Sequence, residues 1–326
     1  MAKIKYAQIG TEHAHSTKMS VYRDSADYEV VGVAEPNPKL RQRLSTDPLY
    51  RDLPQLTEDQ LLNLPGLQVV GVETAVRDQM RVAQKCIDAG KHIHLEKPGG
   101  SSLVAMRKLL NDAAMKHLIV QLGYMYRYNP AIVLLRDLLN RGALGEVFEI
   151  HTVMSKLSPQ GLRDELAEFS GGTMFELGCH LIDLVHGVLG APDQIHAFPR
   201  HSADNDDSLQ DNMLAVFEYP KATATIRSSL IEVDGFARRH FTVVGTHGTL
   251  HIQPLDNPKA QLTLAEAHGD FRKGQQSLTF PRYSRYVGDA NDLARWVRHE
   301  ADPLFSYDHD LAVMRSVLIA SDMPTS

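Results

Sequence analysis

Residues 91–100 read Lys-His-Ile-His-Leu-Glu-Lys-Pro-Gly-Gly. This stretch predicts a short buried strand, His92 to Leu95, which ends where a charged pair meets a proline and two glycines. Open α/β sheets hold their ligands at the carboxyl ends of their strands. A partly desolvated Lys97 at that edge could share a proton with a substrate oxygen near neutral pH. An exposed Glu-Lys pair before a turn is the simpler alternative.

The composition is that of a globular protein with more than one domain. A length of 326 residues favours two domains with cores of their own. The formal charge of −6, without a run rich in lysine and arginine, argues against nucleic acid and acidic membranes as partners. We see no secretory signal and no long apolar run, so we expect a cytoplasmic protein. The two cysteines, Cys86 and Cys179, are expected in the core.

The amino-terminal part, residues 1–125, alternates strand and helix patterns. Repeated strand-helix-strand units need crossover connections and give a parallel, doubly wound sheet of the α/β Rossmann type. A helix is expected from about Ala14 to Ser25, and Ser101 or Ser102 is expected to cap another one. The expected strands are Ile4 to Ile9, Glu29 to Ala34, Leu67 to Val72, His92 to Leu95 and Leu118 to Gly123.

The second part, residues 126–326, is rich in strands after Gly145. Its pattern predicts an α+β domain with a largely antiparallel open sheet. Two terminal helices, residues 287–300 and 308–320, are expected to pack back on the first domain. The expected strands are Val147 to Val153, Gln194 to Phe198, Asn212 to Tyr219, Ala222 to Ile231, His240 to Val244, Thr249 to Ile252 and Gln261 to Ala265.

A glycine-led helix, residues 171–190, carries one polar line on an otherwise apolar surface. Glu176, His180 and Asp183 stand at i, i+4 and i+7. Burying such groups is costly unless they pair or meet a ligand. An acid one turn before a histidine fixes its tautomer and raises its basicity, as a proton-accepting base requires. A polar cluster that satisfies itself is the alternative.

Five motifs follow one another along the chain. They are Ala89-Gly90-Lys91-His92 leading to Glu96-Lys97-Pro98, Tyr126 to Pro130, Gly142 to Val147, the helix with His180 and Asp183, and Val244 to Leu250. In these motifs the chain resembles the glucose-fructose oxidoreductase / inositol dehydrogenase / rhizopine-catabolism (Gfo/Idh/MocA) family. The resemblance implies a Rossmann domain that binds NAD(P) and an open sheet that supplies the substrate site and subunit contacts. It also implies a catalytic lysine at Lys97 and a catalytic acid and histidine at Glu176 and His180.

The dinucleotide fingerprint is eroded. The segment from Gly10 to His15 keeps only the first of three glycines and places Glu12 and His15 at the other two positions. Glu35, at the end of the second strand, can accept hydrogen bonds from ribose hydroxyls and would repel a 2′-phosphate, which favours NAD over NADP. The expected cofactor-binding residues are Gly10, Thr11, Glu12, His13, Glu35, Thr74, Glu96 and Lys97, with the pyrophosphate on the amino end of the first helix.

We expect hydride transfer between a nicotinamide and a secondary alcohol carbon of a sugar, inositol or sugar derivative. His180 would take the hydroxyl proton with Glu176 orienting it, and Lys97 would hydrogen-bond the same oxygen. Further residues expected to bind this carbohydrate-like substrate are Arg127, Lys156, Arg163 and Asp183, of which Asp183 could instead anchor the helix.

Three other functions stay open. The same fold could run a redox-neutral lyase or glycosidase cycle with a tightly held NAD and a transient keto-sugar. A metal-dependent hydrolase could use the pairs His13-x-His15 and His92-x-His94, but its barrel needs eight strand-helix units that the second half does not provide. We therefore expect no metal ligand. A non-catalytic binding protein is the third alternative.

The strands of the second part carry apolar residues on both alternating sets. Met213, Ala215 and Phe217 form one set, and Leu214 and Val216 belong to the other. An open sheet has one face on its helices and another that must be polar, covered or paired. We therefore expect a homodimer or homotetramer assembled through this sheet.

Overall fold

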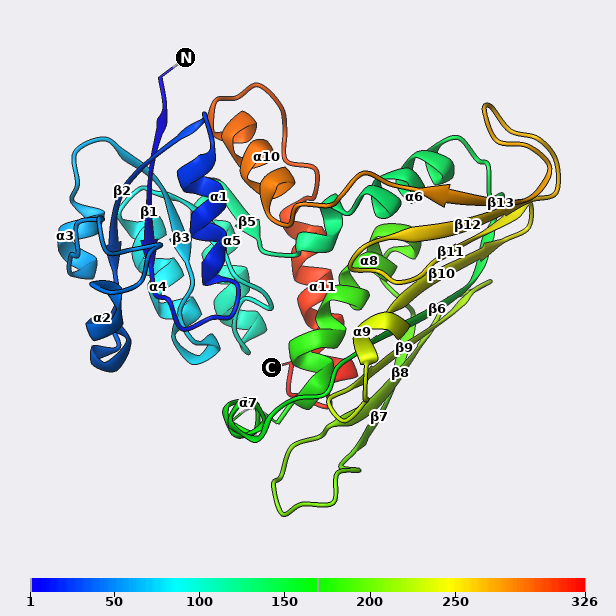
Figure 1. Cartoon of the computed structure of the whole chain (residues 1–326). Coiled ribbons are helices and arrows are strands. Elements are labelled where there is room, and N and C mark those ends of the chain that lie inside the picture. The colour runs from blue at the N-terminus through cyan, green and yellow to red at the C-terminus, as the bar shows by residue number, and fades with distance from the viewer. Residues whose placement is uncertain (1, 169, 326) are drawn as a thin grey trace. The chain divides into compact units, whose positions relative to one another are not determined.

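The computed structural model describes residues 2–168 and 170–325 (Figure 1). The chain divides into two compact units. Unit 1 comprises residues 2–124 with Arg285–Leu311, and unit 2 comprises Met125–Ser284 with Ala312–Thr325.

Unit 1 is built on a five-stranded parallel sheet with the order β2-β1-β3-β4-β5. A single parallel bridge between Val33 and Gln55 adds a rudimentary strand beside β2. With it the order is that of a doubly wound dinucleotide-binding fold, 3-2-1-4-5-6. The prediction of a Rossmann-type sheet is confirmed. The strands are β1 (Ile4–Ile9), β2 (Tyr28–Ala34), β3 (Leu67–Val72), β4 (His92–Leu95) and β5 (Val120–Leu122).

The helices of unit 1 connect these strands, and several begin at a side-chain cap. Thr57 forms a capping box with Gln60 at the start of one helix, and Ser102 caps the helix that begins at Leu103. The connecting helices are α1 (Met19–Asp24), α2 (Pro38–Leu44), α3 (Glu58–Leu62), α4 (Val76–Asp88) and α5 (Leu103–Met115). Helix α10 (Val287–Val297), from far along the chain, adds Leu293 and Trp296 to the core that contains Tyr6.

Unit 2 contains an eight-stranded sheet with the order β13-β12-β11-β10-β6-β9-β8-β7. Only the central pair β6 and β9 is parallel among the described pairings, so the predicted largely antiparallel sheet is confirmed. The strands are β6 (Val147–Ser155), β7 (Gln194–Arg200), β8 (Asn212–Glu218), β9 (Thr223–Ser229), β10 (His240–Gly245), β11 (Gly248–Ile252), β12 (Lys259–Leu264) and β13 (Gly274–Thr279).

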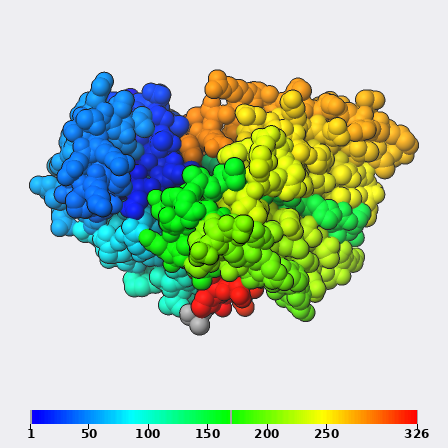
Figure 2. Space-filling view, turned by 60° about the horizontal axis from the view of Figure 1, so that its bottom comes forward, coloured from blue at the N-terminus to red at the C-terminus, as the bar shows by residue number. Residues whose placement is uncertain are grey.

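Helices cover one face of this sheet. The longer helices of the unit are α6 (Pro130–Asn140) and α8 (Cys179–Leu189), joined by the part of α11 (Tyr307–Ala320) that follows Leu311. Two short helices are α7 (Gln160–Leu166) and α9 (Gly235–Arg238). The residues of β8 alternate, with Met213, Ala215 and Phe217 buried and Leu214 and Val216 only half-buried. In the space-filling view, residues around 240–280 gather in one continuous yellow and orange region of the surface (Figure 2).

Three local elements differ from the sequence-based expectations. The helix expected from Ala14 to Ser25 is instead a 3₁₀ turn, Ser16–Lys18, followed by the six residues of α1. The His13 backbone N–H donates to the carbonyl of Glu73 across the sheet, and this bond holds the preceding segment out of a helix. Helix α3 and strand β13 were missed, since neither has a marked apolar period. Among the described residues, no helix has the length and hydrophobicity that a bilayer crossing needs.

Candidate functional site

Strands β1 and β3 of unit 1 meet at the point where the strand order reverses. Gly10 follows β1 with φ +90°, a conformation that favours glycine. A Cβ atom on Gly10 would lie 2.6 Å from the backbone nitrogen of Thr74, which follows β3. The chain therefore needs glycine here, and ligands of doubly wound sheets bind at this kind of switch point.

Strand β4 delivers Glu96 and Lys97 to the same edge of the sheet. Lys97 is only 1% exposed, and its backbone N–H donates to Glu96 Oε2 over 3.1 Å. The exposed Glu-Lys pair that the sequence left open is therefore excluded. Burying an ammonium group costs free energy unless the group is paired or hydrogen-bonded, so the position of Lys97 indicates a polar site.

A buried network surrounds Glu96. The ammonium group of Lys18 is fully buried; it donates to Glu96 Oε1 and lies 3.0 Å from Glu73 Oε1. It also lies 3.1 Å from His94 Nε2, and the other ring nitrogen of His94 is 2.7 Å from the hydroxyl of Tyr22. One buried cation thus serves two carboxylates, which fixes the end of β4 rigidly.

The two carboxylates of this network ionise differently. Burial together with the charge of Glu96 raises the pKa of Glu73 to about 8, although Lys18 opposes the shift. Burial alone would raise the pKa of Glu96 too, but the ammonium of Lys18 and the hydrogen bond with His15 hold it well below its usual range. Because desolvation outweighs the attraction of Glu96, the pKa of His15 is lowered. At neutral pH the cluster therefore contains an ionised Glu96 beside neutral His15.

Two histidines of the eroded fingerprint approach this ionised carboxylate. His15 Nδ1 lies 3.0 Å from Glu96 Oε2, and His13 Nδ1 lies 3.5 Å from the same oxygen. The sequence linked neither histidine to Glu96. By contrast, His92 Nδ1 accepts the backbone N–H of Ile119, whereas His94 joins the same buried network through Lys18.

The remaining cofactor-binding candidates of unit 1 lie around the switch point. Glu12 pairs with Arg77 at 3.0 Å, so its charge is balanced by an arginine. Glu35, 3% exposed, accepts hydrogen bonds from the Thr11 hydroxyl at 2.6 Å and from the backbone of Asn37 at 2.7 Å. A carboxylate has about four lone-pair sites, so Glu35 can still accept from ribose hydroxyls.

These residues fit a dinucleotide with one change from the expected geometry. The close approach at Gly10 and the buried acid Glu35 at the end of β2 are the features that such a fold uses. The helix that follows Gly10 has only six residues and begins at Met19, so it is too short and too far along the chain to cradle the pyrophosphate as expected.

In unit 2, the glycine-led helix is not one regular α-helix. Residues Met174–Gly178 form a π-helical turn, and α8 begins at Cys179. Because a π turn bonds i to i+5, this part of the helix departs from the regular α-helical geometry that the i, i+4 stripe assumed. The role of Glu176 in orienting His180 stays a prediction. His180 is 3% exposed and meets the ring of Tyr126 edge-on at 5.2 Å between centroids. Single π turns are frequent at functional sites.

Asp183 and Arg127 bond to each other. The guanidinium of Arg127 donates to both carboxylate oxygens of Asp183, with a shortest distance of 2.6 Å, and both side chains are buried. This bidentate pair joins α8 to the segment before α6. The geometry supports the alternative in which Asp183 anchors the helix.

Arg163, one of the residues expected to bind the substrate, lies in α7 and pairs with two aspartates. Its guanidinium donates to Asp207 at 2.7 Å and to Asp211 at 2.8 Å, and it is 4% exposed. Arg163 holds the pKa of Asp207 well below its usual range. Arg163 therefore ties α7 to the segment that contains Asp207 and Asp211, and its role in substrate binding stays a prediction. Lys156, also expected to bind substrate, is half-buried between β6 and α7.

We expect Arg163→Ala to lower the free energy of unfolding by about 3–5 kcal/mol, because it leaves two carboxylates without their partner. Denaturant unfolding of purified protein measures this. The matched control is Arg23→Ala, which breaks the exposed bidentate pair with Asp52 and should change stability little. Unchanged stability in Arg163→Ala, together with a raised KM, would instead make Arg163 a substrate residue.

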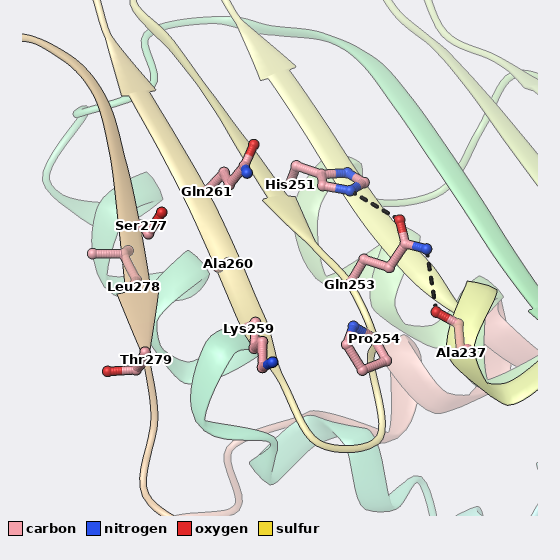
Figure 3. A pocket seen from close by; sticks show the side chains of 10 residues that line it. All are labelled: Ala237, His251, Gln253, Pro254, Lys259, Ala260, Gln261, Ser277, Leu278 and Thr279. Atoms are coloured by element: carbon pink, nitrogen blue, oxygen red, sulfur yellow. Dashed lines mark hydrogen bonds between the residues drawn. The ribbon is translucent and has the colours of Figure 1, made fainter.

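The open face of the unit 2 sheet carries a hollow of about 480 Å³ (Figure 3). Its lining includes His251, Gln253 and Lys259, and a chain of hydrogen bonds runs from His251 through Gln253 to the carbonyl of Ala237. The exposed alternate positions of β11 to β13 form this wall. The hollow therefore lies on the face of the sheet opposite that covered by α8.

Lys18 and Glu73 were not anticipated, although both are fully buried at the site. No local pattern marks Lys18, because its partners His94 and Glu96 lie 76 and 78 residues away in the sequence. Glu73 directly follows β3, just as Glu96 follows β4. Carboxylates at the ends of adjacent parallel strands meet at one edge, and this regularity could have linked them.

Comparison with known proteins supports one family along most of the chain. Residues 4–124 match the profile of an oxidoreductase family with an NAD-binding Rossmann fold, and residues 132–251 match the GFO/IDH/MocA C-terminal domain. The uncharacterized oxidoreductase YhhX of Escherichia coli K12 is 25% identical over 210 residues, which span 63% of this chain and 58% of that protein. The chain therefore matches less than two thirds of the length of this relative.

Two further comparisons extend over more of the chain. Myo-inositol 2-dehydrogenase of Thermotoga maritima is 23% identical over 284 residues, 85% of this chain and 80% of that enzyme. The crystal structure of an NAD binding oxidoreductase from Klebsiella pneumoniae superposes with a TM-score of 0.83 at 17% identity, covering 97% of this chain and 95% of the other. At this low sequence identity, the structural likeness supports the fold assignment alone.

Proposed function

The chain belongs to the GFO/IDH/MocA family of oxidoreductases with an NAD-binding Rossmann fold, and from that premise we propose that it transfers a hydride between NAD and a secondary alcohol carbon of a sugar, inositol or sugar derivative. The observation that carries the proposal is Lys97, buried at the carboxyl end of β4 in the doubly wound sheet. Relatives named as inositol and xylose dehydrogenases support the substrate class.

Bound NAD would supply the hydride acceptor. The roles of the protein's own residues follow from where the proton and the negative charge go during alcohol oxidation. Oxidation of an alcohol releases the hydroxyl proton and places negative charge on the oxygen before the carbonyl forms. The ammonium of Lys97 stabilises this charge, and His180 accepts the proton. The Arg127–Asp183 pair fixes the helix that carries His180.

The direct test is incubation of the protein with NAD and a panel of inositols, aldoses and sugar acids. Accumulation of reduced nicotinamide, followed by its near-ultraviolet absorbance, supports the dehydrogenase. Product formed without free NADH, on protein that retains NAD through dialysis, would identify the redox-neutral lyase or glycosidase cycle. If none of these substrates is converted, either with or without release of free NADH, the proposal is contradicted.

We propose that NAD is preferred to NADP because Glu35 accepts from the adenosine ribose and repels a 2′-phosphate. In Glu35→Gln, which keeps the size of the side chain, the ratio of NADP affinity to NAD affinity should rise about tenfold or more. Calorimetric titration of both nucleotides measures this. Glu12→Gln, which removes a neighbouring charge already paired with Arg77, is the control and should leave the ratio nearly unchanged. An unchanged ratio in Glu35→Gln would remove Glu35 from the nucleotide site.

We also propose a homodimer or homotetramer formed through the open sheet face. Phe198 on β7 is 44% exposed and stands opposite half-buried Leu214 on β8. Light scattering at micromolar concentration should report a dimer or tetramer, and Phe198→Arg should shift the mass toward the monomer. Val104→Arg, at an equally apolar residue that is 65% exposed on α5, is the control and should not. A monomeric wild-type protein would contradict this assembly.

A further inference from the structure

His13, His15 and Glu96 bring three metal-ligating groups together within unit 1. One ligand atom from each residue lies within 4.8 Å of the other two. The measured separations from Glu96 Oε2 are 3.0 Å to His15 Nδ1 and 3.5 Å to His13 Nδ1. Zinc bonds to nitrogen and oxygen are about 2.0–2.1 Å long, so donors at tetrahedral positions lie roughly 3.3 Å apart. The two separations from Glu96 bracket that value, and the ligand atoms of His13 and His15 lie within 4.8 Å of each other.

We propose that His13, His15 and Glu96 bind a divalent transition-metal ion of the zinc class. Two imidazoles and one carboxylate are a donor set that zinc and neighbouring first-row ions accept, whereas magnesium and calcium prefer oxygen donors alone. The site does not depend on the function proposed above. His15 stands at the sixth position of the eroded fingerprint, and neither histidine has a catalytic role in that function.

The carboxylate of the site is held by a second layer of contacts. Glu96 Oε1 accepts from Lys18, and Oε2, which faces the histidines, accepts the backbone N–H of Lys97 at 3.1 Å. Such contacts fix the direction of a ligand before the ion arrives. Glu96 is fully buried at the end of β4, so the site has one rigid wall.

The two histidines form the adjustable side of the site. Their side chains are 8% and 16% exposed for His13 and His15, so water or another oxygen donor can reach an ion held there. His13 Nδ1 accepts the backbone N–H of His15 at 3.2 Å, the long end of the hydrogen-bond range. Three protein ligands with solvent access leave a fourth position open, as in catalytic zinc sites.

The test is the metal content of the full-length protein. We load the protein with Zn²⁺, remove free metal by gel filtration and measure zinc by elemental analysis. One zinc per chain is expected, with the affinity then measured against a competing chelator. Substitution by Co²⁺ should give visible absorption typical of a four- or five-coordinate site with nitrogen ligands. The wild-type protein remaining free of zinc and cobalt would overturn the proposal.

Substitutions of the proposed ligands test where the metal binds. His13→Ala and His15→Ala should each lower zinc affinity by more than about 100-fold, since loss of a ligand exceeds the effect of losing a supporting contact. Glu96→Gln tests the third ligand, but Lys18 then loses a buried partner, so the histidine variants carry the test if that protein does not fold. His151→Ala, on the open face of unit 2, is the matched control and should keep the full zinc content. Retained zinc in the His13→Ala/His15→Ala double variant would overturn the site. Because the readout is bound metal, its failure is distinct from a failure of NAD-dependent activity.

Discussion

Lys97→Ala is expected to lower kcat/KM by about 100- to 1,000-fold, the range measured when one donor to a developing oxyanion is removed. Lys97 is buried at the end of β4, in the segment that also positions Glu96. Initial rates with NAD and the best polyol from the substrate panel measure the effect. Lys97→Arg keeps the charge and should recover part of the lost rate.

Folding must be separated from chemistry in this test. Lys97→Met keeps most of the side-chain volume without the charge, and its thermal unfolding should stay close to that of the wild type. Lys91→Ala is the control within the same stretch, because Lys91 bonds the carbonyl of Leu67 and should be dispensable for turnover. Near-normal activity in a folded Lys97→Met protein would remove Lys97 from the mechanism.

His180→Ala is expected to lower kcat by about 100- to 10,000-fold, the usual contribution of a positioned general base. His180 is the second residue of α8, which follows the π-helical turn, and it contacts the ring of Tyr126. Added imidazole should restore part of the activity, since a small base can enter the space left by the side chain. A purely structural histidine would not show such rescue.

Cys179→Ala provides the neighbouring control. Cys179 is buried and its thiol donates to the carbonyl of Glu176, so we expect no catalytic role and an unchanged rate. Full activity in His180→Ala, or a loss as large in Cys179→Ala, would contradict the assignment of His180 as the base.

Regular patterns in the sequence predicted most of the fold. Strands β3 and β4 were predicted at their exact bounds, because buried parallel strands are short apolar runs between punctuating residues. The two alternating sets of apolar residues in the sequence of β8 match its buried and half-buried sides in the structure equally well. The π-helical turn at Met174–Gly178 could not be anticipated, since an apolar helix with one extra residue in a turn keeps nearly the same composition.

The candidate site was harder to predict because it depends on contacts between residues far apart in the sequence. Lys18 reaches Glu96, 78 residues away, and Arg163 reaches Asp207, 44 residues away. Neither contact leaves a local pattern. Residue types at strand ends correctly brought Gly10 and Thr74 together at the switch point, but they gave no sign that the histidines after Gly10 would turn toward Glu96.

The most direct test of the account is nucleotide binding by protein that has first been stripped of any bound nucleotide. Titration of NAD and of NADP, followed by calorimetry, should show saturable binding of one NAD per chain and weaker binding of NADP. Such a result supports both a dehydrogenase and a redox-neutral cycle, because each requires the nicotinamide. If folded protein binds neither nucleotide, the proposed hydride transfer is wrong.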